Sequence, residues 1–134
     1  MQHQAHYEDV VRDILDFFIK KMEECKLAGI KDLLIDPGFG FGKNIAHNFR
    51  LLKNLSVFKM LDKPIVAGIS RKSTIYKNLK IPVEDSLNGK TVLNTIALLN
   101  GALVIRVSDV KEAKEVIALL DAYGKATHSN SFQN

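Results

Sequence analysis

The sequence predicts an α/β fold with a parallel sheet, because short apolar runs alternate with helical patterns along the chain. Mainly apolar runs of strand length lie at residues 33–35, 65–67 and 103–107, and each leads into a polar or glycine-containing turn. Strands that are apolar on both faces are typical of buried parallel sheets, whose connections are right-handed crossovers. A sheet of three such strands has bare edges, so we expect further strands to pair with it.

The first helix is predicted at residues 7–28, where apolar residues recur with the three-and-four spacing of one helical face. That face consists of Val11, Ile14, Leu15, Phe18, Met22 and Cys25. Asp9 suits the positive end of this helix, and Gly29 suits its C-terminus. A second helix is predicted after the first strand and a glycine-rich loop, with Asn44 as its N-cap. Its apolar side consists of Ile45, Phe49 and Leu52.

Two helices are predicted between the second and third strands, a short one near Arg71 and a longer one from about Glu84 to Asn100. The apolar side of the longer helix consists of Val92, Leu93, Ile96, Ala97 and Leu99. For the last helix, Asp109 and Glu112 form a predicted capping box, which accounts for Asp109 without a functional role. Its inward side is predicted to consist of Val110, Ala113, Ile117 and Leu120.

One domain is predicted at residues 1–123, followed by a disordered polar tail at residues 124–134, because the chain turns small and polar there. A chain of 134 residues is too short for two ordinary domains, and its 46% share of apolar residues is normal for a globular core. The net charge of +4 comes from scattered basic residues without interleaved aromatic residues, which disfavours a nucleic-acid surface.

The location predicted from the sequence is the cytoplasm. Cys25 is the one cysteine and cannot form an internal disulfide, which fits a reducing compartment. The first residues lack the charged-then-apolar order of a signal peptide. No apolar run approaches the ~18 residues of a membrane span, so we expect no membrane partner.

Charged side chains follow or end all three predicted strands. Asp36 comes directly after the first strand, Arg71 and Lys72 come shortly after Gly68 at the end of the second, and Arg106 lies in the third. Because the carboxyl ends of parallel strands meet at one edge, we expect one carboxylate and three cations on the same rim. A charge beside an apolar strand costs free energy unless it is paired or used. The alternative is that these are ordinary loop residues or helix caps.

Two loops on that rim are candidates for ligand binding. The loop at residues 36–43 alternates glycines with aromatic residues, which lets the backbone approach a ligand or turn sharply. It is not a Walker phosphate loop, since no Ser or Thr follows Lys43, and its glycine spacing does not fit a dinucleotide site. Residues 70–73, Ser-Arg-Lys-Ser, start a predicted helix, where free N–H groups and two cations favour an anion. The alternative for these four residues is a helix start with solvated basic side chains.

Three segments, taken in order, resemble successive motifs of dihydropteroate synthases. They are DPGFGFGK at residues 36–43, GISRKS at residues 68–73 and RVSDV at residues 106–110. The resemblance extends from Tyr7 to about Leu120. It implies that the parallel β/α units form the C-terminal half of a TIM (β/α)8 barrel, with residues 1–123 as a partial pterin-binding domain and the first four strands lying outside this sequence.

The resemblance also implies roles at the pterin. Asp36 and Lys72 are the implied catalytic residues: Asp36 accepts hydrogen bonds from ring N–H groups, and Lys72 contacts the carbonyl side of the ring. Gly68 is similar to the glycine whose backbone approaches the pterin. Phe41 is similar to the aromatic residue that borders the p-aminobenzoate pocket.

Anion-binding roles are implied by the same motifs. Ser70 and Arg71 stand where the family's helix N-terminus meets the p-aminobenzoate carboxylate, and Arg106 resembles a residue that binds the diphosphate. Ser108 departs from the family, which usually has a histidine at this position. A serine donates only a neutral hydrogen bond, so we expect the diphosphate to be held less tightly, by ~1–2 kcal/mol. No metal site is expected.

The implied function is the condensation of 6-hydroxymethyl-7,8-dihydropterin diphosphate with p-aminobenzoate, which gives dihydropteroate and diphosphate in folate biosynthesis. The resemblance implies a cytoplasmic transferase that is a homodimer at full length, and a fragment that is inactive alone. It implies no tightly bound cofactor, and Mg²⁺ would arrive only with the diphosphate substrate. Two alternatives stay open: a pterin-binding or interaction module without catalysis, and a fragment of a corrinoid-linked pterin methyltransferase, against which residues 70–73 argue.

Overall fold

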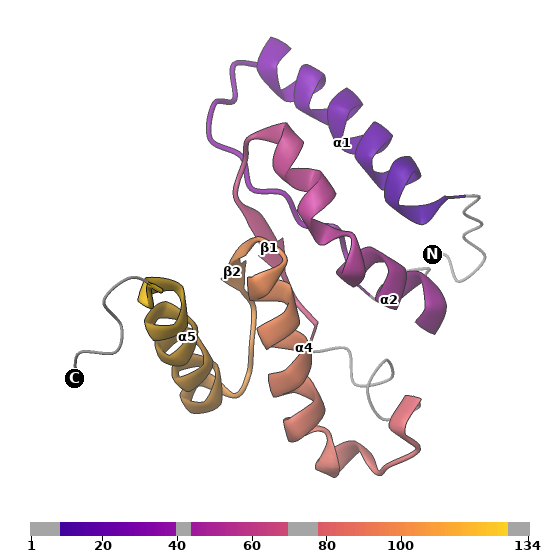
Figure 1. The fold of residues 1–134 in the computed structure, drawn as a ribbon. Coiled ribbons are helices and arrows are strands. Elements are labelled where there is room, and N and C mark those ends of the chain that lie inside the picture. The colour runs from indigo at the N-terminus through magenta and orange to yellow at the C-terminus, as the bar shows by residue number, and fades with distance from the viewer. Residues whose placement is uncertain (1–8, 40–43, 70–77, 129–134) are drawn as a thin grey trace.

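The structure, a computed structural model, describes residues 9–39, 44–69 and 78–128, and within them helices surround a short parallel sheet (Figure 1). The elements are α1 (Val10–Leu27), α2 (Ile45–Lys53), the 3₁₀ helix η1 (Leu55–Leu61), β1 (Ile65–Ala67), the 3₁₀ helix η2 (Val83–Asp85), α4 (Leu87–Leu99), β2 (Ala102–Ile105) and α5 (Val110–Lys125). This alternation confirms the predicted α/β class. The short helix predicted near Arg71 falls outside the described residues.

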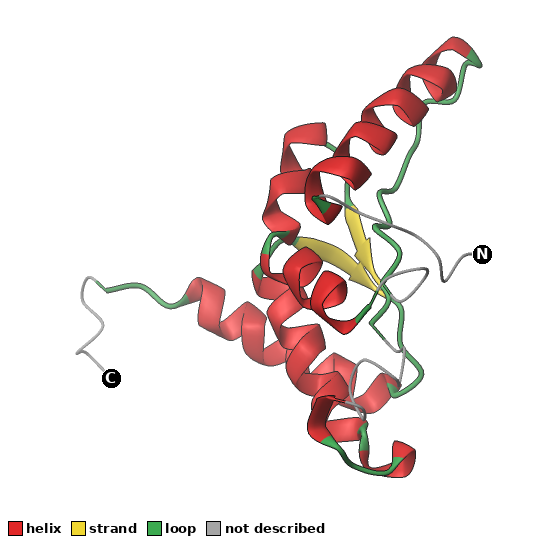
Figure 2. Ribbon diagram, turned by 90° about the vertical axis from the view of Figure 1, so that its right-hand side faces the viewer, coloured by secondary structure: helices red, strands yellow, loops and turns green. Residues whose placement is uncertain are grey.

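The sheet is parallel, and the segments that form it lie side by side in the same order as along the chain. Strands β1 and β2 pair in parallel, with Ala67 opposite Ile105, and they lie side by side in Figure 2. The predicted strand at 33–35 is present only as a single parallel bridge, in which Ile35 N donates to Pro64 O (2.9 Å) and Ile35 O accepts from Val66 N (2.7 Å). The third predicted strand covers Ala102–Ile105 instead of residues 103–107.

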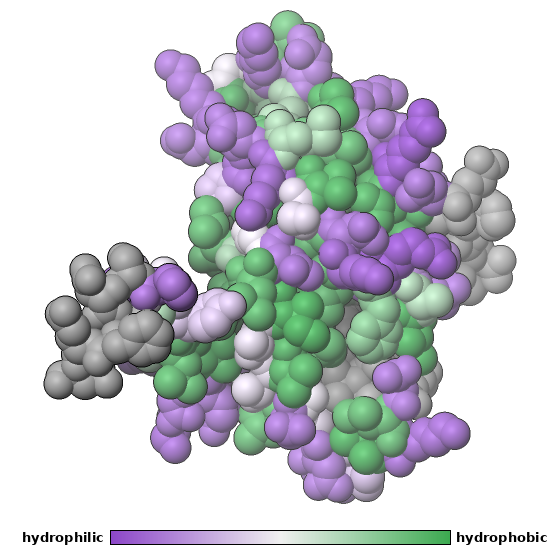
Figure 3. Space-filling view, in the orientation of Figure 1, coloured by the Kyte–Doolittle hydropathy of each residue, from purple (hydrophilic) through white to green (hydrophobic). Residues whose placement is uncertain are grey.

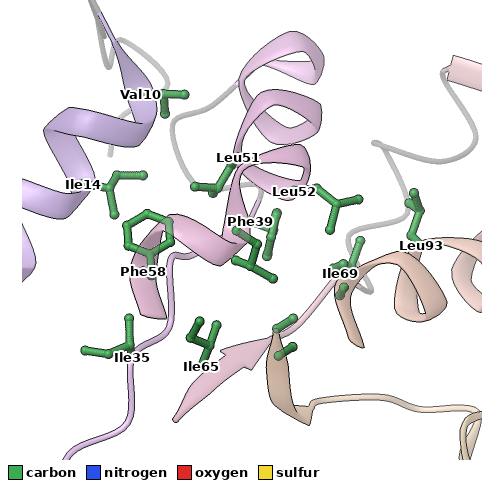
Figure 4. Packing of buried hydrophobic residues seen from close by; sticks show 14 residues of the cluster. Val10, Ile14, Ile35, Phe39, Leu51, Leu52, Phe58, Ile65, Ile69 and Leu93 are labelled. Atoms are coloured by element: carbon green, nitrogen blue, oxygen red, sulfur yellow. The ribbon is translucent and has the colours of Figure 1, made fainter. Parts of the chain in front are cut away.

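The apolar core lies where α1, α2 and η1 meet the start of the sheet (Figure 4). Phe58 is fully buried and meets Phe18 edge-on, with ring centroids 5.8 Å apart. The other large side chains that are buried almost completely there are Val10, Leu51, Leu55 and Ile65. These residues come from α1, α2, η1 and β1. The core therefore holds the three helices against β1.

The N-cap predictions had opposite outcomes. Asn44 caps α2 as predicted: its Oδ1 accepts from His47 N at 2.7 Å, and its own N–H donates to His47 Nδ1 at 3.3 Å. Asp109 precedes α5, but its side chain makes no capping hydrogen bond, so the capping box predicted with Glu112 is wrong. The reason is a competing partner, because the Asp109 carboxylate pairs with Lys90.

The buried side of α5 also differs from the prediction. Ala113 and Val116 are buried, whereas Val110 and Ile117 are 59% and 48% exposed. Helix α5 continues to Lys125, beyond the predicted start of the tail, and residues 129–134 lie outside the described residues.

Apolar side chains remain exposed around β2 and the two helices beside it. The most exposed are Leu103, Leu119 and Tyr123, at 73%, 72% and 71%. Figure 3 shows apolar side chains gathered over α4 and β2. A sheet that lacks neighbouring strands presents such a surface, in agreement with the expectation that further strands pair with this one. Within the described part of the chain, no helix is both long and apolar enough to cross a membrane.

Candidate functional site

Three of the predicted site residues lie together at the carboxyl ends of the strands. Asp36, Gly68 and Arg106 each directly follow the last paired residue of their strand. The backbone N–H of Arg106 donates to Ala67 O at 2.9 Å, which extends the ladder by one residue. The sheet therefore places these three residues on one rim, as the sequence predicted from parallel topology.

The closest contact on this rim is an ion pair between Asp36 and Arg106. Arg106 Nη1 donates to Asp36 Oδ2 at 2.6 Å, across 70 residues of sequence. The other carboxylate oxygen, Oδ1, accepts from Gly38 N at 3.0 Å. The side chains are 35% exposed for Asp36 and 59% exposed for Arg106. An ion pair this accessible contributes about 0–1 kcal/mol, so an incoming ligand can separate it at small cost.

Gly68 provides the space in which the Arg106 guanidinium lies. A Cβ atom added at Gly68 would lie 2.6 Å from Arg106 Cζ and 2.9 Å from its Nε. Both distances are shorter than van der Waals contact allows, so one of the two groups would have to move. Gly68 is buried, so the guanidinium rests directly on its backbone. A residue with a side chain at this position would displace Arg106.

The glycine-rich loop starts with a sharp turn anchored in the core. Gly38 has φ +74°, a left-handed conformation that glycine adopts without strain, and its N–H binds Asp36. Pro37 is buried, and Phe39 is a core residue at 4% exposure. The sequence predicted that the glycines of this loop let the backbone approach a ligand or turn sharply, and the left-handed Gly38 confirms the sharp turn. The ring of Phe39 completes the apolar core and thereby fixes the turn that holds Asp36.

Four of the predicted site residues fall outside the described residues. They are Phe41, Ser70, Arg71 and Lys72. Their roles stay predictions. Ile69, the last described residue before them, is buried at 3% exposure.

Ser108 lies on the same loop as Arg106 but does not join the ion pair. Strand β2 ends at Ile105, so residues 106–109 form a loop, and the alternation of side chains along a strand does not apply to them. Among the described residues, no hydrogen bond joins Ser108 to Arg106. Ser108 is exposed and lines a small hollow between α4 and α5, together with Lys90 and Asp109.

Sequence reasoning missed Lys90. Its Nζ lies 2.5 Å from Asp109 Oδ2, with side chains 13% and 35% exposed. The signal that was available is a lysine in the first turn of a helix, where the helix dipole disfavours a cation. Nothing in the sequence identified its partner. Over residues 9–39, 44–69 and 78–128, no cluster of His, Cys, Asp and Glu has the make-up of a metal site.

The chain matches known proteins over almost its whole length. A family model described as "pterin binding enzyme" matches residues 1–108. The dihydropteroate synthase of Escherichia coli K12 is 38% identical over 135 residues, which cover 99% of this chain and 48% of that protein. The dihydropteroate synthase of Haemophilus influenzae is 41% identical over 128 residues, covering 94% of this chain and 46% of the relative.

Solved structures of dihydropteroate synthases from other bacteria share the fold. The crystal structure of Yersinia pestis dihydropteroate synthase aligns with a TM-score of 0.88 at 43% identity and covers 94% of this chain and 53% of its own. The Xanthomonas albilineans enzyme in complex with 7,8-dihydropteroate aligns with a TM-score of 0.89 at 34% identity, covering 95% and 51%. The same enzyme has been solved with 4-aminobenzoic acid. The chain thus spans about half the length of the relatives that it matches.

Proposed function

This chain belongs to the pterin-binding enzyme family, and from that premise we propose that it supplies about half of a dihydropteroate synthase. The proposed reaction joins 6-hydroxymethyl-7,8-dihydropterin diphosphate to p-aminobenzoate and releases diphosphate. The observation that carries the proposal is the Asp36–Arg106 pair over Gly68, because it puts a carboxylate and a cation side by side at the rim where parallel barrels bind substrates. That this is the C-terminal half rests on the order of the three motifs.

Asp36 is proposed to bind the pterin ring. Its carboxylate can accept hydrogen bonds from two adjacent ring N–H groups once Arg106 moves aside. Gly38 N continues to hold one oxygen, so the carboxylate keeps its orientation during this exchange. Lys72 is proposed to contact the carbonyl side of the ring, on the sequence resemblance alone.

Arg106 is proposed to bind the diphosphate after it leaves Asp36. The reaction needs stabilisation of a departing anion and of a cationic pterin more than it needs a general base. The arginine offers several N–H donors to phosphate oxygens, and its exposed guanidinium can reach a ligand without rearrangement of the backbone. Each end of the substrate then takes one member of the pair, so neither charge is left unpaired. Mg²⁺ is proposed to enter only as a companion of the diphosphate.

The second substrate is proposed to be p-aminobenzoate. Support comes from the Xanthomonas albilineans relative, solved with 4-aminobenzoic acid. The residues proposed to contact it, Phe41, Ser70 and Arg71, come from the sequence resemblance. The relatives matched are synthases, which supports this function over a pterin-binding module without catalysis or a corrinoid-linked methyltransferase. A cytoplasmic homodimer is proposed for the full-length protein.

Calorimetry of the full-length protein tests the proposed binding site. Titration with 6-hydroxymethylpterin should give weak binding alone and tighter binding when inorganic diphosphate is present, because diphosphate draws Arg106 away from Asp36. An Arg106→Gln variant should bind the pterin alike with and without diphosphate. No pterin binding under either condition would rule out the proposed site.

A serine-to-histidine exchange at Ser108 tests the diphosphate end of the site. Ser108→His should tighten the binding of inorganic diphosphate by about three- to tenfold at mildly acid pH, because an imidazolium donates a charged hydrogen bond. The gain should fade at alkaline pH, where imidazole loses its proton. Calorimetry of the parent protein and the variant at both pH values measures the effect. Equal affinities throughout would mean that this position does not contact the anion.

A further inference from the structure

We infer that Lys90, through its ion pair with Asp109, is a positioning residue for the diphosphate-binding loop at residues 106–109. This inference rests on the proposed function of Arg106 and goes beyond it, since Lys90 lies in helix α4, outside the loop that carries Arg106. The pair joins the first turn of α4 to the last loop residue before α5.

A lysine at position 90 does not stabilise its own helix, α4. Lys90 N donates to Ser86 O at 2.9 Å, so the lysine stands in the first turn of α4. The positive end of the helix dipole disfavours a cation there. The side chain is also only 13% exposed, less than any other lysine or arginine in the ion pairs of the described residues. A cation in this position needs a partner, and the Asp109 carboxylate is that partner.

Asp109 likewise forms the ion pair in place of an interaction with its own helix. An aspartate before a helix ordinarily accepts a hydrogen bond from the first-turn N–H groups, yet the Asp109 side chain makes none. Only its backbone carbonyl joins the helix, accepting from Ala113 N at 3.1 Å. The carboxylate points instead to Lys90. The first-turn N–H groups of α5 are therefore left without a side-chain cap, and the carboxylate charge is neutralised by the lysine.

The pair fixes the far end of a very short loop. At its near end, the backbone N–H of Arg106 binds Ala67 O at 2.9 Å. At its far end, Asp109 is held by Lys90 and by the start of α5. Only Val107 and Ser108 lie between these two anchors. Movement of Asp109 would therefore shift Ser108 and Arg106 directly.

The pair also has an electrostatic consequence. Glu112 lines the same small hollow as Lys90, Ser108 and Asp109. Without the lysine, two carboxylates would face this end of the loop with no cation between them, and both would repel a diphosphate. Removal of the Lys90 charge should thus harm anion binding more than removal of both charges of the pair. A purely structural ion pair would not show that order.

The test is the affinity of the full-length protein for inorganic diphosphate, measured by calorimetry. Lys90→Met should weaken binding by roughly tenfold, as expected for coupled neighbours in one network. The double variant Lys90→Met/Asp109→Asn should recover only part of this loss, to about threefold below the parent, because the unpaired Asp109 carboxylate is gone but the ion pair that anchors the loop is gone as well. Lys90→Arg should bind within about twofold of the parent. Lys125→Met is the matched control, since it removes a lysine from an exposed ion pair with Asp121 at the other end of α5.

The outcomes separate this inference from the proposed function. If Arg106→Gln weakens diphosphate binding but Lys90→Met leaves it unchanged, the positioning role is wrong and the proposed site stands. A double variant that binds as tightly as the parent also overturns the inference, because the ion pair would then not be needed to position the loop. If Arg106→Gln itself has no effect, the proposed function fails and the inference fails with it. Thermal melting and the affinity for 6-hydroxymethylpterin should stay near the parent values for Lys90→Met, and a parallel loss of both would show a general loss of folding instead.

Discussion

An Asp36→Asn exchange in the full-length protein should reduce kcat/KM for the pterin diphosphate by at least about a hundredfold, the scale seen when a charge-stabilising group is removed from an active site. Asparagine keeps the size of the side chain, and its carbonyl oxygen can still accept from Gly38 N. It loses the negative charge that favours a cationic pterin. It also replaces one acceptor with an N–H donor, which would face either Arg106 or a ring N–H.

The fold should survive this exchange. The Asp36–Arg106 pair is partly exposed and contributes about 0–1 kcal/mol, so the melting temperature should change by only a few degrees. Asp121→Asn is the matched control, because Asp121 pairs with Lys125 on the exposed side of α5, 2.9 Å away. Steady-state kinetics and thermal melting of both variants measure the effect. Near-normal turnover in Asp36→Asn would show that this carboxylate does not contact the reacting pterin.

A Gly68→Ala exchange should weaken the binding of the pterin diphosphate by roughly ten- to a hundredfold, the scale set by a misplaced positioning group. The new Cβ would occupy the space of the Arg106 guanidinium, which must swing away. Such a movement is easy, because the guanidinium is the end of a flexible and mostly exposed side chain. The free energy of unfolding should therefore change little, while the alignment of Arg106 is lost.

Gly124→Ala provides the comparison for Gly68→Ala. A Cβ at Gly124 would meet no atom within 4 Å, and the residue lies in helix α5. Its replacement should stabilise the protein by about 0.5–1 kcal/mol through helix propensity, with substrate affinity unchanged. Denaturant unfolding and pterin diphosphate binding are measured for both variants. A Gly68→Ala protein that unfolds easily but binds substrate normally would mean that Gly68 serves packing and not the position of Arg106.

The sequence predicted those parts of the fold that depend on local pattern. Strand β1 has the predicted bounds, because Ile65, Val66 and Ala67 are buried on every side, as a central parallel strand requires. The run at 33–35 has the same apolar character, yet only Ile35 pairs. Its outer edge has no neighbouring strand among the described residues. Of the three predicted strands, only β1 has partners on both sides in the part of the chain that the structure describes, and it alone has the predicted bounds.

Capping shows the limit of local reasoning most clearly. Asn44 and Asp109 both carry an N-cap signature, and only Asn44 caps its helix. The difference is Lys90, which lies in another helix and attracts the Asp109 carboxylate. No short-range pattern contains that competition. The burial of Phe39 shows the same limit, since it depends on helices that lie elsewhere in the chain.

The candidate site was predicted from the parallel topology of the sheet and did not depend on local capping or burial patterns. Parallel strands deliver their carboxyl ends to one rim, and this alone brings Asp36 and Arg106 together. It could not predict that the two pair directly, because that depends on the open space above Gly68. It also could not place Ser108, since β2 ends at Ile105 and residues 106–109 form a loop whose side-chain directions the strand pattern does not determine.

Formation of dihydropteroate is the most direct test of the proposed function. Product should be measured by chromatography for the full-length protein and for residues 1–134 alone, each with pterin diphosphate and p-aminobenzoate. The full-length protein should form dihydropteroate at the rate at which it releases diphosphate. Residues 1–134 should form none, because catalysis by positioning fails when half of the positioning groups are missing. Product from the purified chain alone, or none from the full-length protein, would contradict the proposal that this sequence is one half of a dihydropteroate synthase.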